Sequence, residues 1–388
     1  MEKTSSPSTP SITPWPRRLI IIFSLLGPIT VAMLIYLDDG FDPAPLPDAG
    51  PWPSPSVPVH HRRILPAVEK LGYGILNGPE DLAYDADDRL LYTSCADGWI
   101  KRLTLSDVAS PETVDDWVYV GGRPLGIAFG PDKELIVAEA DKGLMRVSRE
   151  GVVELLADEA EGVKFRFTDG VDVASDGVIY FTDASSKYSL AEHVLEVMEG
   201  RGYGRLMSYD PSTKSTLVLV RGLYFANGVA LSPLQDYLLF CQTVLRKCQK
   251  YHLQGEKKGT VEDFIDNLPG FPDNIRYDGE GHFWIGIAMA RTRLWDITFK
   301  YPILRKSLVT IDRYVKVPLM QHDAGVLGVN LEGEAVALYS DPSLQGVTGG
   351  LKIGEHLYYG LLTGVYVGRI NLTQHAPHDA AAAAAAAV

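Results

Sequence analysis

Apolar and polar residues alternate in short runs along most of the chain, a pattern typical of β-strands with one face toward water. The runs come in pairs: a strand that opens with Asp, Asn or Gly, a turn, and a second strand rich in Tyr, Phe, Leu and Ile. The pair occurs six times, starting at Gly78, Arg123, Thr168, Ala226, Pro272 and, in degenerate form, Val347. Repeats of roughly 40–50 residues indicate a propeller or a solenoid. We therefore expect an all-β fold, a six-bladed β-propeller over residues 62–372 with four strands in each blade.

The last repeat ends one strand short of a complete blade. The segment RRILPAVEKLGYGILNG, residues 62–78, precedes the first blade and belongs to no repeat. If it supplies the missing strand, the ring closes and no open sheet edge remains.

Two insertions interrupt the β pattern. Residues 189–205 open with a Ser-x-x-Glu capping-box signature, Ser189 to Glu192, and continue with helical spacing. Residues 291–308 mix Arg and Lys with Trp, Phe and Tyr. We expect two short helical insertions over one face of the propeller, either as packing caps or as a lid at a substrate entrance. The composition of the second also suits contact with a membrane.

The N-terminus predicts a membrane anchor. Residues 1–18 are a polar tail that we expect to be disordered, and residues 19–37 are nineteen uncharged residues, enough to span a bilayer. Arg17 and Arg18 precede the apolar run and Asp residues follow it. The positive-inside rule then places the tail in the cytoplasm and the propeller in the lumen or outside. A cleaved signal peptide is the alternative.

The segments flanking the propeller complete the organisation. Residues 38–61 are a Pro-rich linker, expected to be a semi-rigid spacer that holds the domain off the membrane. Residues 373–388 are polar and then poly-Ala, and we assign them no function. We expect single-pass localisation in the secretory pathway, in the endoplasmic reticulum, the vacuole or the plasma membrane. Asn371 opens the sequon Asn-Leu-Thr and is a candidate for glycosylation.

Charge and missing motifs exclude several functions. The net charge of the 388 residues is −13, and no basic patch combines with aromatic residues, so nucleic acid is not an expected partner. The sequence contains no G-x-S-x-G elbow, H-E-x-x-H motif, P-loop or C-x-x-C pair.

The three cysteines divide into a pair and a single residue. Cys241 and Cys248 flank QTVLRK, and a two-residue turn at Val244 and Leu245 would bring them face to face across a hairpin. An oxidising lumen then favours a disulfide, and the alternative is two small half-buried residues. Cys95 has no evident partner and is expected in the core.

Oxygen-bearing side chains recur where the blades begin. Equivalent blade positions lie on a ring around the axis, so the repeat register brings five of them together: Glu80, Asp169, Asn227, Asp273 and Asn274. Crowded carboxylates need a neutralising partner, and Ca²⁺ prefers six to eight such oxygens. The absence of Cys and of spaced His in this set argues against zinc. Simple turn hydrogen bonds at strand starts are the alternative.

Six segments of the repeats carry a resemblance to a known family. They are GPEDLAYD, GRPLGIAFGPD, YFTDASSKYSL, GRLMSYDPST, ANGVALSP and PDNIRYDGEGHFWIG. They resemble the strictosidine synthase-like family of plants and the animal adipocyte plasma membrane-associated protein, over about residues 65–370. The resemblance implies a six-bladed propeller related to paraoxonases and gluconolactonases. It also implies that Glu80, Asn227 and Asp273 match ligands of a catalytic calcium, and that Asp169 and Asn274 match further ligands of the paraoxonase type.

Two departures from these relatives limit what the resemblance implies. Strictosidine synthase uses a glutamate near the start of the last blade, where this chain has Thr348, and the nearest acid is Glu355 in a turn. Paraoxonases have a channel histidine where this chain has Leu125. Strictosidine synthesis is therefore not expected, and hydrolysis driven by that histidine is in doubt.

The sequence thus favours a membrane-anchored, Ca²⁺-dependent hydrolase of lactones or aryl esters with a small-molecule substrate. The cation would polarise the carbonyl, and Asp273 or Asp169 would position or deprotonate water. The alternative is a non-catalytic propeller that binds a small molecule or a protein and uses the metal for structure.

Overall fold

The computed structural model describes residues 40–47, 56–105, 113–313 and 322–375, with the single residues 27 and 54. The predicted tail, the poly-Ala segment and the predicted anchor, apart from Gly27, lie outside the described residues. Among the described residues, no helix is long and apolar enough to cross a membrane.

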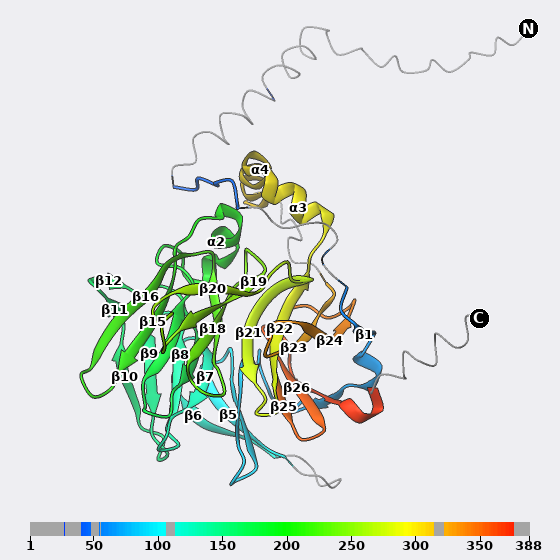
Figure 1. The fold of residues 1–388 in the computed structure, drawn as a ribbon. Coiled ribbons are helices and arrows are strands. Elements are labelled where there is room, and N and C mark those ends of the chain that lie inside the picture. Colours follow the sequence, from blue (N-terminus) through cyan, green and yellow to red (C-terminus); the bar gives the residue numbers. More distant parts are fainter. Residues whose placement is uncertain are drawn as a thin grey trace, which may run out of the picture.

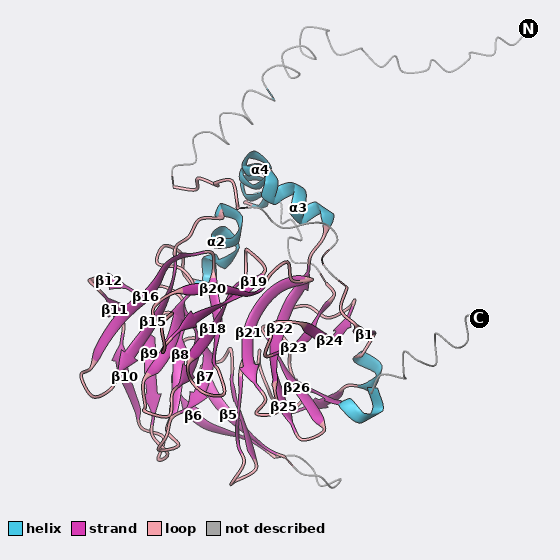
Figure 2. Cartoon of the chain, in the orientation of Figure 1, coloured by secondary structure: helices cyan, strands magenta, loops and turns pink. Residues whose placement is uncertain are grey.

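Six antiparallel units of four strands make up the domain (Figures 1 and 2). The first three are β3 (Leu82–Asp85), β4 (Leu90–Ser94), β5 (Trp99–Thr104) and β6 (Val114–Tyr119); β7 (Pro124–Phe129), β8 (Leu135–Glu139), β9 (Gly143–Val147) and β10 (Val153–Ala157); and β13 (Thr168–Val173), β14 (Ile179–Asp183), β15 (Gly204–Asp210) and β16 (Ser215–Leu223). The next are β17 (Ala226–Leu231), β18 (Tyr237–Gln242), β19 (Lys247–His252) and β20 (Val261–Ile265); β21 (Gly270–Tyr277), β22 (His282–Ala290), β23 (Ala324–Asn330) and β24 (Ala335–Asp341); and β25 (Val347–Ile353), β26 (His356–Leu361), β27 (Val367–Asn371) and β2 (Glu69–Leu71). A small hairpin, β11 (Glu159–Ala160) and β12 (Val163–Lys164), follows the second unit.

The units form a closed ring. The first strand of each unit contacts the first strand of the next, and β25 contacts β3. The N-terminal strand β2 completes the last blade, with Leu71 opposite Val367 on β27. The six-bladed β-propeller and the predicted closure by residues 62–78 are both confirmed.

Each blade packs its sheet face against the next blade. Ile127, Leu135 and Val137 of the second blade are fully buried and share one apolar cluster with Ile100 of the first. The alternating strands of the sequence therefore have buried residues on both faces wherever a neighbouring blade covers them.

One strand was not expected. β1 (Val59–Arg62) lies at the end of the segment interpreted as a linker and pairs parallel with β24, so that the fifth blade has an additional outer strand. Side chains support the pairing, because His60 Nε2 lies 3.0 Å from Ser340 Oγ and Arg62 forms an ion pair with Asp323 at 2.8 Å. A 3₁₀ turn, Leu65–Ala67, then leads into β2.

The predicted disulfide between Cys241 and Cys248 is present. The Arg246 N–H donates to the Thr243 carbonyl at 3.2 Å, which closes the turn around Val244 and Leu245 as the spacing predicts. The cysteines are direct partners in the β18–β19 register. The third cysteine, Cys95, is free and buried in the core, also as expected.

Both insertions are helical and lie at one end of the propeller (Figure 2). The first contains the 3₁₀ turn Leu190–Glu192 and α2 (His193–Glu199), and the Ser189 N–H donates to the Glu192 carboxylate at 3.1 Å, as the capping-box signature predicts. The second contains α3 (Arg293–Lys300) and α4 (Pro302–Asp312). These helices cover the end of the ring where the first strands begin. The last described turn, Leu372–His375, follows β27.

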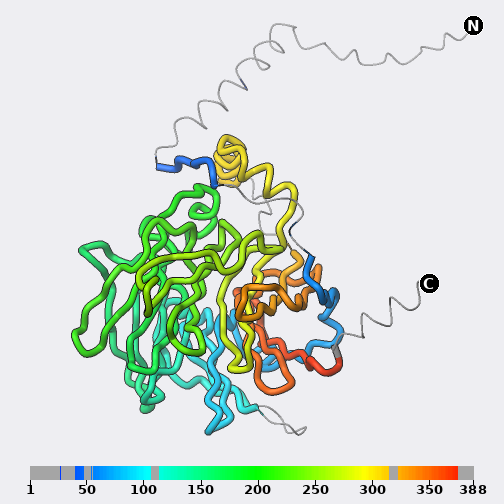
Figure 3. Tube along the Cα trace, in the orientation of Figure 1, coloured from blue at the N-terminus to red at the C-terminus, as the bar shows by residue number. Residues whose placement is uncertain are grey.

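Residues 40–47 do not act as a free spacer. Phe41 is buried in the apolar cluster under the helices, and the Ala44 N–H donates to the Glu199 carbonyl at 3.0 Å. Figure 3 shows this blue segment running beside α2 and α4. The expectation that the whole linker holds the domain off the membrane is wrong for this part of the chain, because these residues are docked on the domain.

Candidate functional site

Six equivalent positions surround the axis at the helix-covered end. Each lies near the start of the first strand of a blade, within four residues of it, and they are Glu80, Leu125, Asp169, Asn227, Asp273 and Thr348. In five blades the strand register shifts at this position, between residue pairs such as Thr168/Val171 and Pro272/Ile275. A bulge of this kind redirects a side chain. Along the rest of each first strand, side chains alternate regularly between the two faces of the sheet. The repeated bulges explain why the side chains at the ring positions nevertheless face one another.

Glycine after the ring position lets neighbouring blades approach closely. A Cβ atom at Gly126 would lie 2.5 Å from the Asp169 carbonyl oxygen, and one at Gly170 would lie 2.7 Å from that of Asn227. Neither distance is compatible with a side chain, so these two positions require glycine for packing rather than for a turn.

Side chains at the ends of the second strands hold the backbone that precedes the ring. Glu139 accepts from the Arg123 N–H at 2.5 Å, and Asp183 accepts from the Phe167 N–H at 2.9 Å. Asp183 is itself paired with Arg205 at 2.6 Å in a fully buried ion pair. The ring residues therefore stand on segments fixed by charge-assisted hydrogen bonds.

Three of the predicted ligands form one acidic cluster. Glu80, Asp169 and Asp273 each offer a carboxylate oxygen, and these oxygens lie within 4.8 Å of one another. Glu80 and Asp169 are almost fully buried, at 2% and 3% exposure. The Asn274 amide donates to Glu80 Oε1 at 2.7 Å, so this residue also reaches the cluster.

Burial and nearby carboxylates raise the pKa of all three acids. Burial raises the pKa of Glu80 and of Asp169 well above the ordinary range, and neighbouring carboxylates add to the rise. Burial raises the pKa of Asp273 to about 7, although a hydrogen bond from Asn227 opposes the rise. The cluster is costly to ionise without a cation, which is the electrostatic signature of a metal site.

Two oxygen atoms at the cluster support the fit of a cation. Glu80 Oε2 and Asn227 Oδ1 are buried and have no hydrogen-bond partner among the described residues. Buried oxygens are normally satisfied, so both suit a hard oxygen-coordinated cation such as Ca²⁺. Glu80, Asp169, Asn227 and Asp273 therefore offer oxygens that fit a cation. Asn274 reaches the cluster through its amide N–H, and its predicted role as a ligand stays a prediction.

A second charged layer lies along the first strands, and sequence reasoning missed it. Arg276 forms an ion pair with Asp81, whose Oδ2 also accepts from the Ile127 N–H at 2.8 Å. Asp172 accepts from the Leu231 N–H at 2.8 Å. The signal was present in the sequence, since Asp81 follows Glu80 and Arg276 follows Asp273 by three residues. This layer ties together strands from the first, second and fifth blades.

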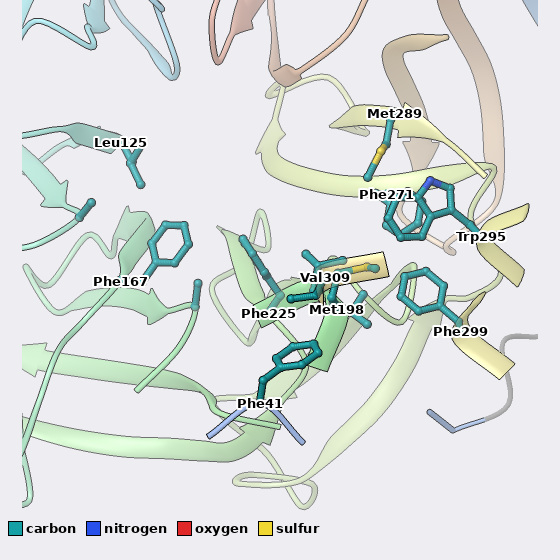
Figure 4. Packing of buried hydrophobic residues seen from close by; sticks show 14 residues of the cluster. Phe41, Leu125, Phe167, Met198, Phe225, Phe271, Met289, Trp295, Phe299 and Val309 are labelled. Carbon is teal, nitrogen blue, oxygen red and sulfur yellow. The ribbon is translucent and has the colours of Figure 1, made fainter. Parts of the chain in front are cut away.

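The other two ring positions have structural roles. The Thr348 hydroxyl donates to the Glu80 carbonyl oxygen, which joins the last blade to the first. Leu125 is buried in an apolar cluster with Phe167, Phe225 and Phe271 from successive blades (Figure 4). Neither side chain offers an acid or a base to the channel.

A cavity of about 90 Å³ lies between the ring and the helices. Asn227 and Asp273 line it together with His193, Met198 and Trp295, so it joins two donors of the cluster to an otherwise apolar wall. His193 of α2 belongs to this wall. His193 Nδ1 lies 2.8 Å from the Leu190 carbonyl oxygen. Because a carbonyl only accepts, Nδ1 carries the proton, and Nε2 of the neutral ring is the basic nitrogen.

Comparison with known proteins identifies relatives of the whole domain. The family described as Strictosidine synthase matches residues 169–256, and the family described as Strictosidine synthase-like, N-terminal, matches residues 65–103. Protein STRICTOSIDINE SYNTHASE-LIKE 4 of Arabidopsis thaliana is 46% identical over 358 residues, which cover 92% of this chain and 96% of the relative. The human adipocyte plasma membrane-associated protein is 37% identical over 285 residues, covering 70% of this chain and 68% of the relative.

Solved structures support the fold. A gluconolactonase from Xanthomonas campestris aligns with a TM-score of 0.56 and 18% identity, covering 83% of this chain and 98% of its own. The calcium-binding protein regucalcin from Agrobacterium tumefaciens aligns with a TM-score of 0.55 and 14% identity, covering 81% and 95%. At these identities the likeness concerns architecture alone.

Proposed function

This chain belongs to the strictosidine synthase-like family, and from that premise we propose that it is a Ca²⁺-dependent hydrolase of small esters or lactones. One observation carries the proposal: two buried carboxylates and the half-buried Asp273, all with raised pKa values, meet beside a cavity with apolar walls, and the oxygens Glu80 Oε2 and Asn227 Oδ1 at this cluster have no hydrogen-bond partner among the described residues. The gluconolactonase and calcium-binding neighbours share this architecture and support the direction of the proposal.

Each part of the cavity has a role in this reaction. When bound, the calcium ion supplies Lewis acidity to the ester carbonyl. Asp273, which lines the cavity and has a pKa of about 7, positions or deprotonates the attacking water. His193, whose basic Nε2 belongs to the same wall, is a second candidate for that proton. Asp169 provides a further carboxylate to the acidic cluster. Met198 and Trp295 are apolar side chains of the cavity wall that keep bulk water away.

The cavity accommodates several water molecules, so a substrate with a larger acyl or alcohol group requires α2 and α3 to move apart. This agrees with the interpretation of the insertions as a lid. Strictosidine synthesis is not supported, because the Thr348 hydroxyl is engaged with the Glu80 backbone and the position offers no base.

The compartment is part of the proposal. A disulfide between Cys241 and Cys248 is typical of an oxidising environment, which supports a secretory-pathway location with the propeller in the lumen or outside. The anchor at residues 19–37 and glycosylation at Asn371, where β27 ends, remain predictions.

The test is hydrolysis of a panel of aryl esters and lactones by the full chain in mild detergent, with Ca²⁺ or with EGTA. We expect turnover that requires Ca²⁺ and falls at least about a hundredfold in Asp273→Asn, a loss typical of removing one catalytic group. Asp172→Asn is the matched control, since it changes a half-buried aspartate outside the acidic cluster and should retain turnover. Ca²⁺-independent turnover, or equal loss in both variants, would contradict the assignment.

A non-catalytic propeller that binds a small molecule or a protein is the second candidate. The small size of the cavity favours it, since a metal that only holds six blades together needs no substrate space. Ca²⁺ binding to the folded chain without turnover of any panel member would favour this function.

A further inference from the structure

The helices α3 and α4 are apolar on two sides. On the inner side Trp295, Phe299 and Val309 pack into the cluster that covers the ring (Figure 4). On the outer side Leu294 and Ile303 are 61% and 60% exposed. A surface helix normally has one apolar face, so a second apolar face indicates a second partner.

The outer side is also free of exposed acids. Within the described residues 293–313, every exposed side chain is aliphatic, aromatic or cationic: Arg293, Leu294, Ile297, Lys300, Tyr301, Ile303, Leu304, Ile311 and Arg313. Asp296 and Asp312, the acids of this segment, are partly buried. We call these nine side chains the outer face of α3–α4. Its composition is unusual in a chain whose net charge is −13.

The chain enters the domain beside this face. Lys187 Nζ donates to the Gly40 carbonyl at 2.8 Å, and the Asp42 N–H donates to Glu199 at 2.7 Å. Arg305 of α4 donates to the carbonyls of Ala44 and Met198. Asp42 and Ala44 therefore fix this segment next to α2, and Ala44 also contacts α4. Figure 3 shows the blue segment running beside both helices.

The apolar segment of the sequence ends only three residues before residue 40, at Leu37. Three residues span at most about 11 Å even when fully extended. If residues 19–37 cross a bilayer, the end of the propeller that carries α3 and α4 is held close to the membrane surface.

From these observations we propose that the outer face of α3–α4 binds an anionic bilayer surface. Its aliphatic side chains enter the boundary between headgroups and acyl chains, and its cations meet anionic headgroups. A second copy of the chain is a poorer partner, because a two-fold contact would place this cationic face against itself without acids to pair with. The membrane then covers the apolar side that the domain leaves exposed, and the cavity lies at the membrane-facing end.

The test uses the full chain reconstituted in vesicles of phosphatidylcholine and phosphatidylserine. Ile303→Cys provides a single reactive thiol for a fluorophore, because Cys95 is buried and the other cysteines form the disulfide. Brominated acyl chains should quench this label at least about twofold, since interfacial side chains lie roughly 5–10 Å deep. Leu234→Cys is the control: this residue is 82% exposed in the loop after β17, at the opposite end of the strand from the ring, and its label should not be quenched.

A second variant tests the electrostatic part. On phosphatidylserine vesicles, Lys300→Gln should lower the ratio of propeller domains bound at the membrane surface to domains detached from it by about fivefold. This factor corresponds to about 1 kcal/mol per cation. Equal quenching at positions 303 and 234 would overturn the proposal. That result is expected if the face is open to water, covered by a second copy of the chain or covered by residues 19–37.

Discussion

Replacing Asp273 by Asn should stabilise the metal-free protein, although the residue is proposed to act in catalysis. The oxygens of Glu80, Asp169 and Asp273 lie within 4.8 Å, so two ionised members repel by about 3.5 kcal/mol at an effective dielectric constant of about 20. Burial is the main cause of the raised pKa of Asp273, and the size of that rise gives the cost of ionising this side chain in the folded state. The pKa rises from 3.8 to about 7, and at about 1.4 kcal/mol per unit this corresponds to about 4 kcal/mol.

The sign follows from proton linkage. The folded state binds the Asp273 proton more tightly than the unfolded state, so the stabilisation is complete below pH 3.8 and is lost as the pH rises through about 7. The amide has no charge to lose. In EGTA, Asp273→Asn should therefore match the wild type near pH 4 and exceed it by up to about 4 kcal/mol at pH 8.

Urea unfolding of the full chain in mild detergent, followed by tryptophan fluorescence at both pH values, measures this difference. Ca²⁺ at a hundred times its Kd should narrow the difference at pH 8 by up to about 2.7 kcal/mol, because it stabilises the wild type by that amount and the variant, which loses a ligand charge, gains less. Asp183→Asn is the matched control, and it should lower the free energy of unfolding. It leaves Arg205 buried without its carboxylate, which should cost about 3–5 kcal/mol. An Asp273→Asn protein no more stable than wild type at pH 8 in EGTA would refute the electrostatic account of the cluster.

Two further predictions concern the helices and the fourth blade. Burial raises the pKa of Glu196 on α2 to about 8 despite a hydrogen bond from Ser185 at 2.6 Å, so its stabilisation is lost as the pH rises from about 4.5 through 8. Glu196→Gln should raise the Tm at pH 9 but not at pH 4, and an unchanged pH dependence of Tm would argue against this. Replacing Cys241 and Cys248 by Ser opens a loop with a sequence separation of 7 and should cost about 2–3 kcal/mol in urea unfolding, whereas an unchanged midpoint would show that the crosslink does not constrain the unfolded chain.

The repeat register made much of the fold and site predictable. A propeller places equivalent positions at equal height, so aligning Glu80 with Asp169 and Asp273 in the sequence was enough to predict their approach. The disulfide was predictable for a similar reason, because hairpin register depends on a turn of two residues.

Features that depend on tertiary pairing were not predictable. The sequence VHHR of β1 has no strand pattern of its own and becomes a strand because β24 offers it an edge. Phe41 lies in a Pro-rich segment and is buried only because α2 and α4 leave a place for it. His193 reaches the cavity through the orientation of a short helix, which local spacing does not determine.

The closure of the ring by β2 has a consequence for biosynthesis. Glu69 of β2 pairs with Arg369, 300 residues later in the chain. At roughly 5–20 residues per second, β2 leaves the ribosome some 15–60 s before its partner exists. During that interval β1 and β2 are unpaired strands close to the N-terminal apolar segment, and the first blade has no neighbour on one side. Synthesis of the last blade therefore also allows the ring to close. A chain truncated before β27 would leave β2 without its partner.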